Sequence, residues 1–150
     1  MKKAFSEHCI YTIVHTDLLA EAARKAEPTR FRESKAWVTG RQLWQQAQAA
    51  GVGFPVLFGD ATDCSRLEYW GPLTGVEIEG EATRFTVDRV RPLQGAHNPQ
   101  ELVLRSTGEP IAPRFIRPYA ICRTPAFLSE PDAESGAAPD RGGMKASRDT

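Results

Sequence analysis

Strand patterns follow one another through the second half of the chain, with no helical pattern between them. They occupy residues 54–59, 67–79, 83–93, 101–106 and 114–123. Because consecutive strands joined by short turns pair as hairpins, this succession predicts an antiparallel sheet. It also lacks the regular strand–helix alternation that a doubly wound parallel sheet requires.

The first half contains one strand pattern and two helical patterns. Residues 8–15 (HCIYTIVH) are apolar and β-branched, which indicates a buried strand. Asp17 is a suitable cap for a helix that Pro28 closes, and Thr39 for a second helix that Gly51 ends.

Residues 29–36 (TRFRESKA), between the two helical patterns, are interpreted as a polar connector. The whole order predicts an α+β fold, with two helices in the N-terminal half. We expect a curled, mostly antiparallel sheet, or a pseudo-barrel, of about six strands.

The chain length of 150 residues suits a single domain, which we expect to cover 1–128. Residues 129–150 are rich in Pro, Gly, Ser, Ala and charge, a composition that predicts a disordered tail. No apolar run reaches the length of about 18 residues that a membrane span needs. We therefore expect a cytoplasmic protein with no membrane partner.

Charge is unevenly distributed, although the formal net charge is zero. Residues 60–81 contain six acids and one arginine, whereas residues 84–123 contain seven arginines, three acids and no lysine. Arginine makes planar, bidentate contacts with phosphates and base edges, and salt-bridged surface strands explain the same pattern.

Two kinds of catalysis can be tested against the sequence. Asp60, Glu77 and Glu79 could hold a divalent ion in a nuclease or hydrolase, but the lysine of such sites has no counterpart here. Cys64 follows Asp63, and neighbouring acids raise a thiol pKa and reduce its reactivity. No catalytic motif, metal-ligand spacing or cofactor motif occurs, so a non-enzymatic protein without metal or cofactor is favoured.

The three cysteines, Cys9, Cys64 and Cys122, are widely spaced and predict neither a disulfide framework nor a zinc site.

The aromatic residues indicate a binding function instead of catalysis. Trp37 precedes the second helix, and Tyr69 and Trp70 are adjacent in a strand pattern, so their side chains point to opposite faces. Either the two rings pack in different layers, or one lies exposed and stacks a base of single-stranded nucleic acid. The segment that follows Pro113 interleaves basic and aromatic residues, namely Arg114, Arg117, Tyr119 and Arg123.

The segments PVLFGDA (55–61), YWGPLTGVEIE (69–79) and TRFTVDRVRPL (83–93), with Trp37 ahead of a helix, resemble the PUA-like superfamily. This superfamily includes the ASCH, EVE and YTH domains, and the resemblance covers residues 37–123. It implies a small pseudo-barrel that binds RNA or a modified base in an aromatic cleft near Trp37 and Trp70.

The sequence therefore predicts a non-enzymatic domain that binds RNA or DNA, as a single strand or a flipped base, or a modified nucleobase. Its expected ligand-binding residues are Trp37, Asp60, Asp63, Tyr69, Trp70, Arg114, Arg117, Tyr119 and Arg123. The tryptophans would stack on the base, a carboxylate would accept hydrogen bonds from its ring N–H groups, and arginines would contact phosphates. The alternatives are the metal-dependent nuclease and a module that binds a protein or a small metabolite.

Overall fold

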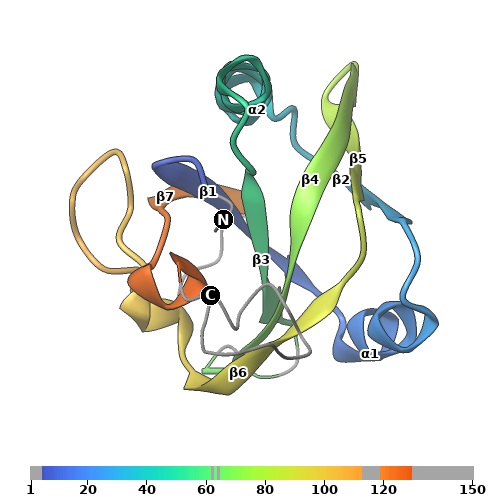
Figure 1. Cartoon of the computed structure of the whole chain (residues 1–150), viewed down its shortest axis with the longest axis vertical. Helices are drawn as coiled ribbons and strands as arrows, with labels where there is room; N and C mark the ends of the chain where they lie inside the picture. The colour runs from blue at the N-terminus through green and yellow to red at the C-terminus, as the bar shows by residue number, and fades with distance from the viewer. Residues whose placement is uncertain (1–4, 62, 64, 113–118, 130–150) are drawn as a thin grey trace.

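A computed structural model describes residues 5–61, 63, 65–112 and 119–129 (Figure 1). Its elements are, in chain order, β1 (His8–Val14), α1 (Thr16–Lys25), β2 (Thr29–Glu33), α2 (Val38–Ala50), β3 (Pro55–Asp60), β4 (Leu67–Glu79), β5 (Ala82–Val87), β6 (Arg91–His97), the 3-10 helix η1 (Pro99–Glu101), β7 (Tyr119–Arg123) and the 3-10 helix η2 (Ala126–Ser129).

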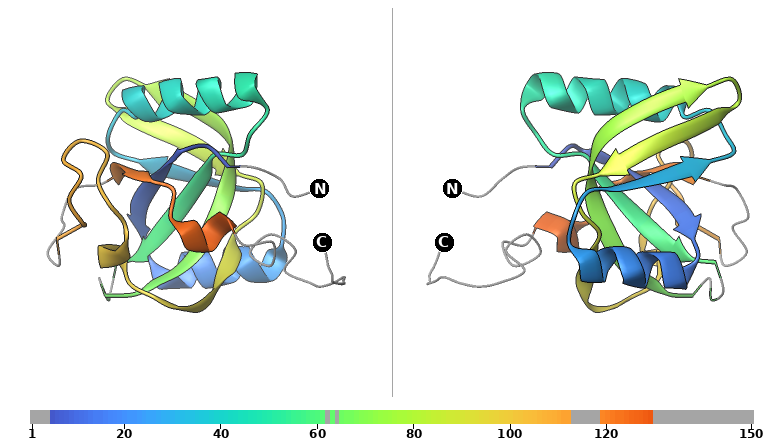
Figure 2. Two further views of the ribbon diagram at one scale, coloured as in Figure 1. Left: turned by 60° about the vertical axis from the view of Figure 1, so that its left-hand side comes forward. Right: turned by 90° about the vertical axis from the view of Figure 1, so that its right-hand side faces the viewer.

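The strands form one curled sheet in the order β2-β5-β4-β3-β1-β7, and β6 pairs with β4 beside this path. Strands β1 and β3 are parallel, and the other pairs are antiparallel. The crossover from β1 to β3 contains both helices, which lie at opposite ends of the curled sheet (Figure 2). The predicted α+β fold with a mostly antiparallel curled sheet is confirmed.

Alternation along β1 divides its side chains between two hydrophobic cores. Ile10 belongs to the first core, which also contains residues of both helices and of β3, β4 and β5. Tyr11 belongs to the second core, on the other face of the sheet, where Leu102, Ile111 and Leu128 cover it. Successive residues at the centre of β1 therefore face one core and then the other.

A row of stacked aromatic rings crosses the first core. Phe31 stacks on Phe85 with ring centroids 5.2 Å apart, and Phe85 stacks on Trp37 at 4.3 Å. Trp37 in turn stacks on Tyr119 at 5.1 Å. The row joins β2, β5, the start of α2 and β7.

Several predicted boundaries were wrong. The connector assigned to 29–36 contains β2, and the single strand assigned to 83–93 is two strands, β5 and β6. The strand assigned to 101–106 is absent from the described structure, where Val103 and Leu104 form only isolated bridges.

The helix ends are partly as expected. Helix α1 begins at Thr16 after an N-cap at His15, not Asp17, and α2 begins one residue before Thr39. Gly51 ends α2 in a left-handed conformation with φ of 74°, as predicted. Of the tail predicted at 129–150, Ser129 ends η2 and residues 130–150 lie outside the described residues.

Candidate functional site

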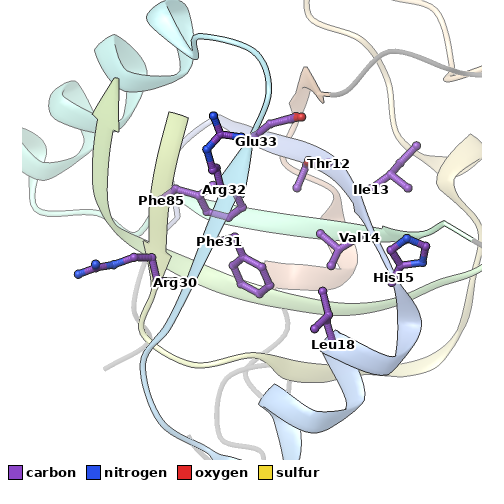
Figure 3. Close-up of a pocket in the computed structure, with 10 residues that line it drawn as sticks. All are labelled: Thr12, Ile13, Val14, His15, Leu18, Arg30, Phe31, Arg32, Glu33 and Phe85. Carbon is purple, nitrogen blue, oxygen red and sulfur yellow. The ribbon is translucent and has the colours of Figure 1, made fainter. Parts of the chain in front are cut away.

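A cavity of about 300 Å³ opens between the C-terminal part of β1 and the strand β2 (Figure 3). Its volume is at the lower end of the range for small-ligand pockets. The lining residues come from β1, α1, β2 and β5, and are Thr12, Ile13, Val14, His15, Leu18, Arg30, Phe31, Arg32, Glu33 and Phe85.

Sheet topology explains the position of this cavity. In the described structure, β2 is the last strand at one end of the sheet and pairs only with β5. Strand β1 lies near the other end, between β3 and β7. Because the sheet curls, the unpaired edge of β2 comes opposite the end of β1 without pairing with it. The cavity occupies the resulting opening.

The apolar part of the cavity is built around Phe31. This ring packs at 5.2 Å against Phe85 and at 5.1 Å against Phe58, measured between ring centroids. Figure 3 shows Phe31, Val14 and Leu18 converging from three elements. Leu18 is 57% exposed, although large apolar side chains of an amphipathic helix usually turn inward. An apolar planar molecule that entered here would have a ring face and two aliphatic side chains as neighbours.

The Glu33 carboxylate lies at the end of β2 and points toward β1 (Figure 3). Its Oε2 accepts hydrogen bonds from the backbone N–H of Ser34 at 2.8 Å and from the Ser34 hydroxyl at 3.3 Å. Its Oε1 is buried, and no described residue donates a hydrogen bond to it. A buried acceptor without a donor is costly, so an N–H or O–H group brought to this oxygen would be favourable.

Glu33 also influences Tyr119 at the far end of the aromatic row. Burial raises the pKa of Tyr119, and the negative charge of Glu33 raises it further. The phenol therefore stays neutral and able to donate a hydrogen bond beyond its usual pH range.

Arg30 and Arg32 alternate with Phe31 and Glu33 along β2, and both are exposed. Neither forms an ion pair with another described residue. Arg32 lies directly opposite Arg84 across the β2–β5 pair, a like-charge arrangement that is unfavourable on its own. Arg84 pairs with Glu79 at 3.3 Å, which leaves the β2 arginines available for an anion.

The two tryptophans predicted to stack a ligand are both buried. Trp37 is 0% exposed within the aromatic row, and Trp70 is 1% exposed within the second core. Phe5 packs edge-on against Trp70 at 5.5 Å, and the Arg91 guanidinium lies 5.5 Å from the same ring. Neither indole presents a face to a ligand, so their expected place in an open cleft is wrong. Tyr69 and Trp70 pack in different layers, the alternative that strand alternation allowed.

The predicted carboxylates do not line the cavity. Asp60 ends β3 opposite Val14 and is 7% exposed, so it lies on the same face of the sheet as the cavity. Asp63 accepts hydrogen bonds from the backbone N–H of Ser65 at 3.0 Å and from its hydroxyl at 2.6 Å. These bonds lower the pKa of Asp63 and hold a local turn.

The remaining predicted site residues are dispersed. Tyr69 lies opposite Phe58 and is partly buried against the first core, and Tyr119 belongs to the aromatic row. Arg123 is exposed at the end of β7, opposite His8. Arg114 and Arg117, like Cys64, lie outside the described residues.

The metal-site alternative required Asp60, Glu77 and Glu79 to meet. Glu77 and Glu79 lie near the tip of the β4–β5 hairpin, opposite Arg84 and Ala82 respectively. Among the described residues, no three His, Cys, Asp or Glu side chains gather where they could hold a metal ion. The structure does not assemble these carboxylates.

The residues of β2 were missed because the segment was interpreted as a connector. A signal was present in TRFRE, where Arg30 and Arg32 alternate with Phe31 and Glu33 at the period of a strand. One apolar residue in five was too weak a pattern against the polar surroundings.

No protein-family model matches the chain, and no curated protein is significantly similar to it. Among the helices of the described residues, none has the length and apolar character of a membrane-spanning segment.

Proposed function

We propose that the chain binds a nucleobase, carried by a nucleotide or by RNA or DNA, in the cavity between β1 and β2. The observation that carries the proposal is an aromatic ring, Phe31, flanked in sequence by two arginines at the mouth of a pocket. Membership of the PUA-like superfamily and a cytoplasmic location remain predictions from the sequence.

Stacking would provide the apolar part of the binding energy. A base entering the cavity would contact Phe31, whose position is supported from behind by Phe85 and Phe58. Stacking of one base on an aromatic side chain contributes about 1–3 kcal/mol, for any base, because each has a π face. Leu18 would cover the opposite side of the ligand at the mouth.

The phosphate would be met by the arginines of β2. Arg30 extends outward from the strand (Figure 3), and Arg32 lies directly opposite Arg84 across the β2–β5 pair. An anion near these side chains would relieve the repulsion between Arg32 and Arg84. Because arginine–phosphate contacts release counterions from a nucleic acid, affinity should fall as salt rises.

Calorimetric titration with nucleoside monophosphates and with a short single-stranded RNA tests the proposal. Phe31→Leu keeps an apolar side chain but removes the ring face, and should weaken binding by about 1–3 kcal/mol. Arg32→Gln should weaken binding and reduce its dependence on salt.

Two matched variants control for effects on folding. Phe54→Leu alters a ring of the same core that does not line the cavity, and Arg105→Gln removes an exposed arginine from a distant loop. Both should bind as the unaltered protein does. Equal affinities for Phe31→Leu and Phe54→Leu would contradict the stacking role.

A further inference from the structure

The Glu33 carboxylate distinguishes this cavity from a general aromatic pocket. The arginines of β2 and the ring of Phe31 can bind any nucleotide, because every base has a π face and every nucleotide a phosphate. An ionised carboxylate is more selective, since it accepts hydrogen bonds and cannot donate them. One of its two oxygens is occupied by Ser34, and the other, Oε1, is buried with no donor among the described residues. A ligand in the cavity should therefore supply an N–H or O–H donor to Oε1.

We infer that Glu33 selects an amino-bearing nucleobase, whose exocyclic N–H group donates to Oε1. This inference rests on the proposed function, since it names the class of base that the same cavity takes. Cytosine carries an amino donor where uracil carries a carbonyl acceptor. A carbonyl oxygen turned toward the buried Oε1 would place two acceptors together with no hydrogen between them, which is unfavourable.

The surroundings of Glu33 support this role. Ser34 donates to Oε2 with both its backbone N–H, at 2.8 Å, and its hydroxyl, at 3.3 Å, and these two bonds orient the half-buried carboxylate. Thr12, only 2% exposed, lies on the neighbouring wall of the cavity. Hydrogen bonds to an ionised acceptor are shorter and stronger than neutral ones, so a single contact can decide between bases.

Matched pairs of nucleotides test the inference by calorimetry. Cytidine monophosphate differs from uridine monophosphate at the amino position, and guanosine monophosphate from inosine monophosphate only by its 2-amino group. We expect the amino-bearing member of each pair to bind at least about tenfold more tightly.

The variant Glu33→Gln should reduce both preferences to within about threefold, because its amide lacks the charge and can donate to a carbonyl oxygen. Glu109→Gln, in an exposed loop away from the cavity, should keep the original preference. Thermal unfolding of both variants separates selectivity from loss of folding.

Two results would overturn the inference, and they differ in what they say of the proposed function. If all four nucleotides bind equally, with affinity that still depends on Phe31 and Arg32, the selection is wrong and the nucleobase site stands. If none of the four nucleotides binds, the nucleobase site and its selection are both wrong.

Discussion

Gly71 and Gly75 lie four residues apart in β4, yet a methyl group would meet different surroundings at the two positions. A Cβ atom on Gly71 would lie 2.7 Å from the carbonyl oxygen of Arg89 and 3.1 Å from the Cβ of Val87. On Gly75 the nearest atoms, both of Thr86, would be 3.8 Å away, which is ordinary contact.

We therefore expect Gly75, but not Gly71, to tolerate replacement by alanine. Gly71→Ala should lower the free energy of unfolding by about 1–3 kcal/mol, because the backbone at Arg89 must shift. Gly75→Ala should change it by less than about 0.5 kcal/mol. Urea unfolding monitored by circular dichroism measures both, and equal losses would show that the close approach at Gly71 is not tight.

Thr83 joins two elements through one buried hydroxyl. Its Oγ1 accepts a hydrogen bond from the backbone N–H of Trp37 at 2.8 Å and donates one to the carbonyl oxygen of Lys35 at 2.7 Å. The side chain is 0% exposed. This bond pair holds the beginning of α2 on β5, next to the stacked ring of Trp37.

Replacing Thr83 by valine should reduce the free energy of unfolding by about 1–3 kcal/mol, because the Trp37 N–H would be buried without an acceptor. Thr83→Ser keeps the hydroxyl and should cost less than the valine variant, although valine is closer in shape. A serine variant less stable than the valine variant would contradict this account of the junction.

The β1–β7 pair carries two buried cysteines. Cys9 lies directly opposite Cys122, and both thiols are free and 0% exposed. Burial raises the pKa of Cys122 to about 12. Burial, with a contribution from Cys122, also raises the pKa of Cys9. Reaction of either thiol with a reagent requires β7 to separate from β1.

In a Cys64→Ser background, thiol labelling of the folded protein at pH 8 should be at least about tenfold slower than in urea. The folded protein keeps both thiols protonated, whereas the unfolded chain loses these protons above the usual thiol pKa near 8.5. The contribution of the thiols to folding stability is therefore complete below that pH and decreases as pH rises toward 12. The free energy of unfolding should therefore fall above about pH 9. Labelling that is equally fast in both conditions would mean that β7 opens freely.

Sequence patterns predicted most elements, because β1 is a continuous apolar, β-branched run and α2 and β4 are long segments with their own helical and strand signals. They did not predict β2, which has one apolar residue in five positions and depends on its pairing with β5. A short edge strand is defined by its tertiary partner more than by its own composition.

The site was harder to predict than the strands and helices, because it depends on tertiary structure across the whole molecule. The sequence drew attention to Trp37 and Trp70, which the fold uses to fill its two cores. The cavity joins residues 12–18 to residues 30–33, and only the curl of the complete sheet brings these segments together. No local pattern contains that information.

Binding of a nucleobase between β1 and β2 can be followed residue by residue by backbone amide NMR during a titration with cytidine monophosphate. We expect the largest chemical-shift changes on residues 12–18 and 30–33, with small changes in the loop at 104–110. Changes centred on Trp70 and Arg123, or no changes at millimolar nucleotide, would contradict it.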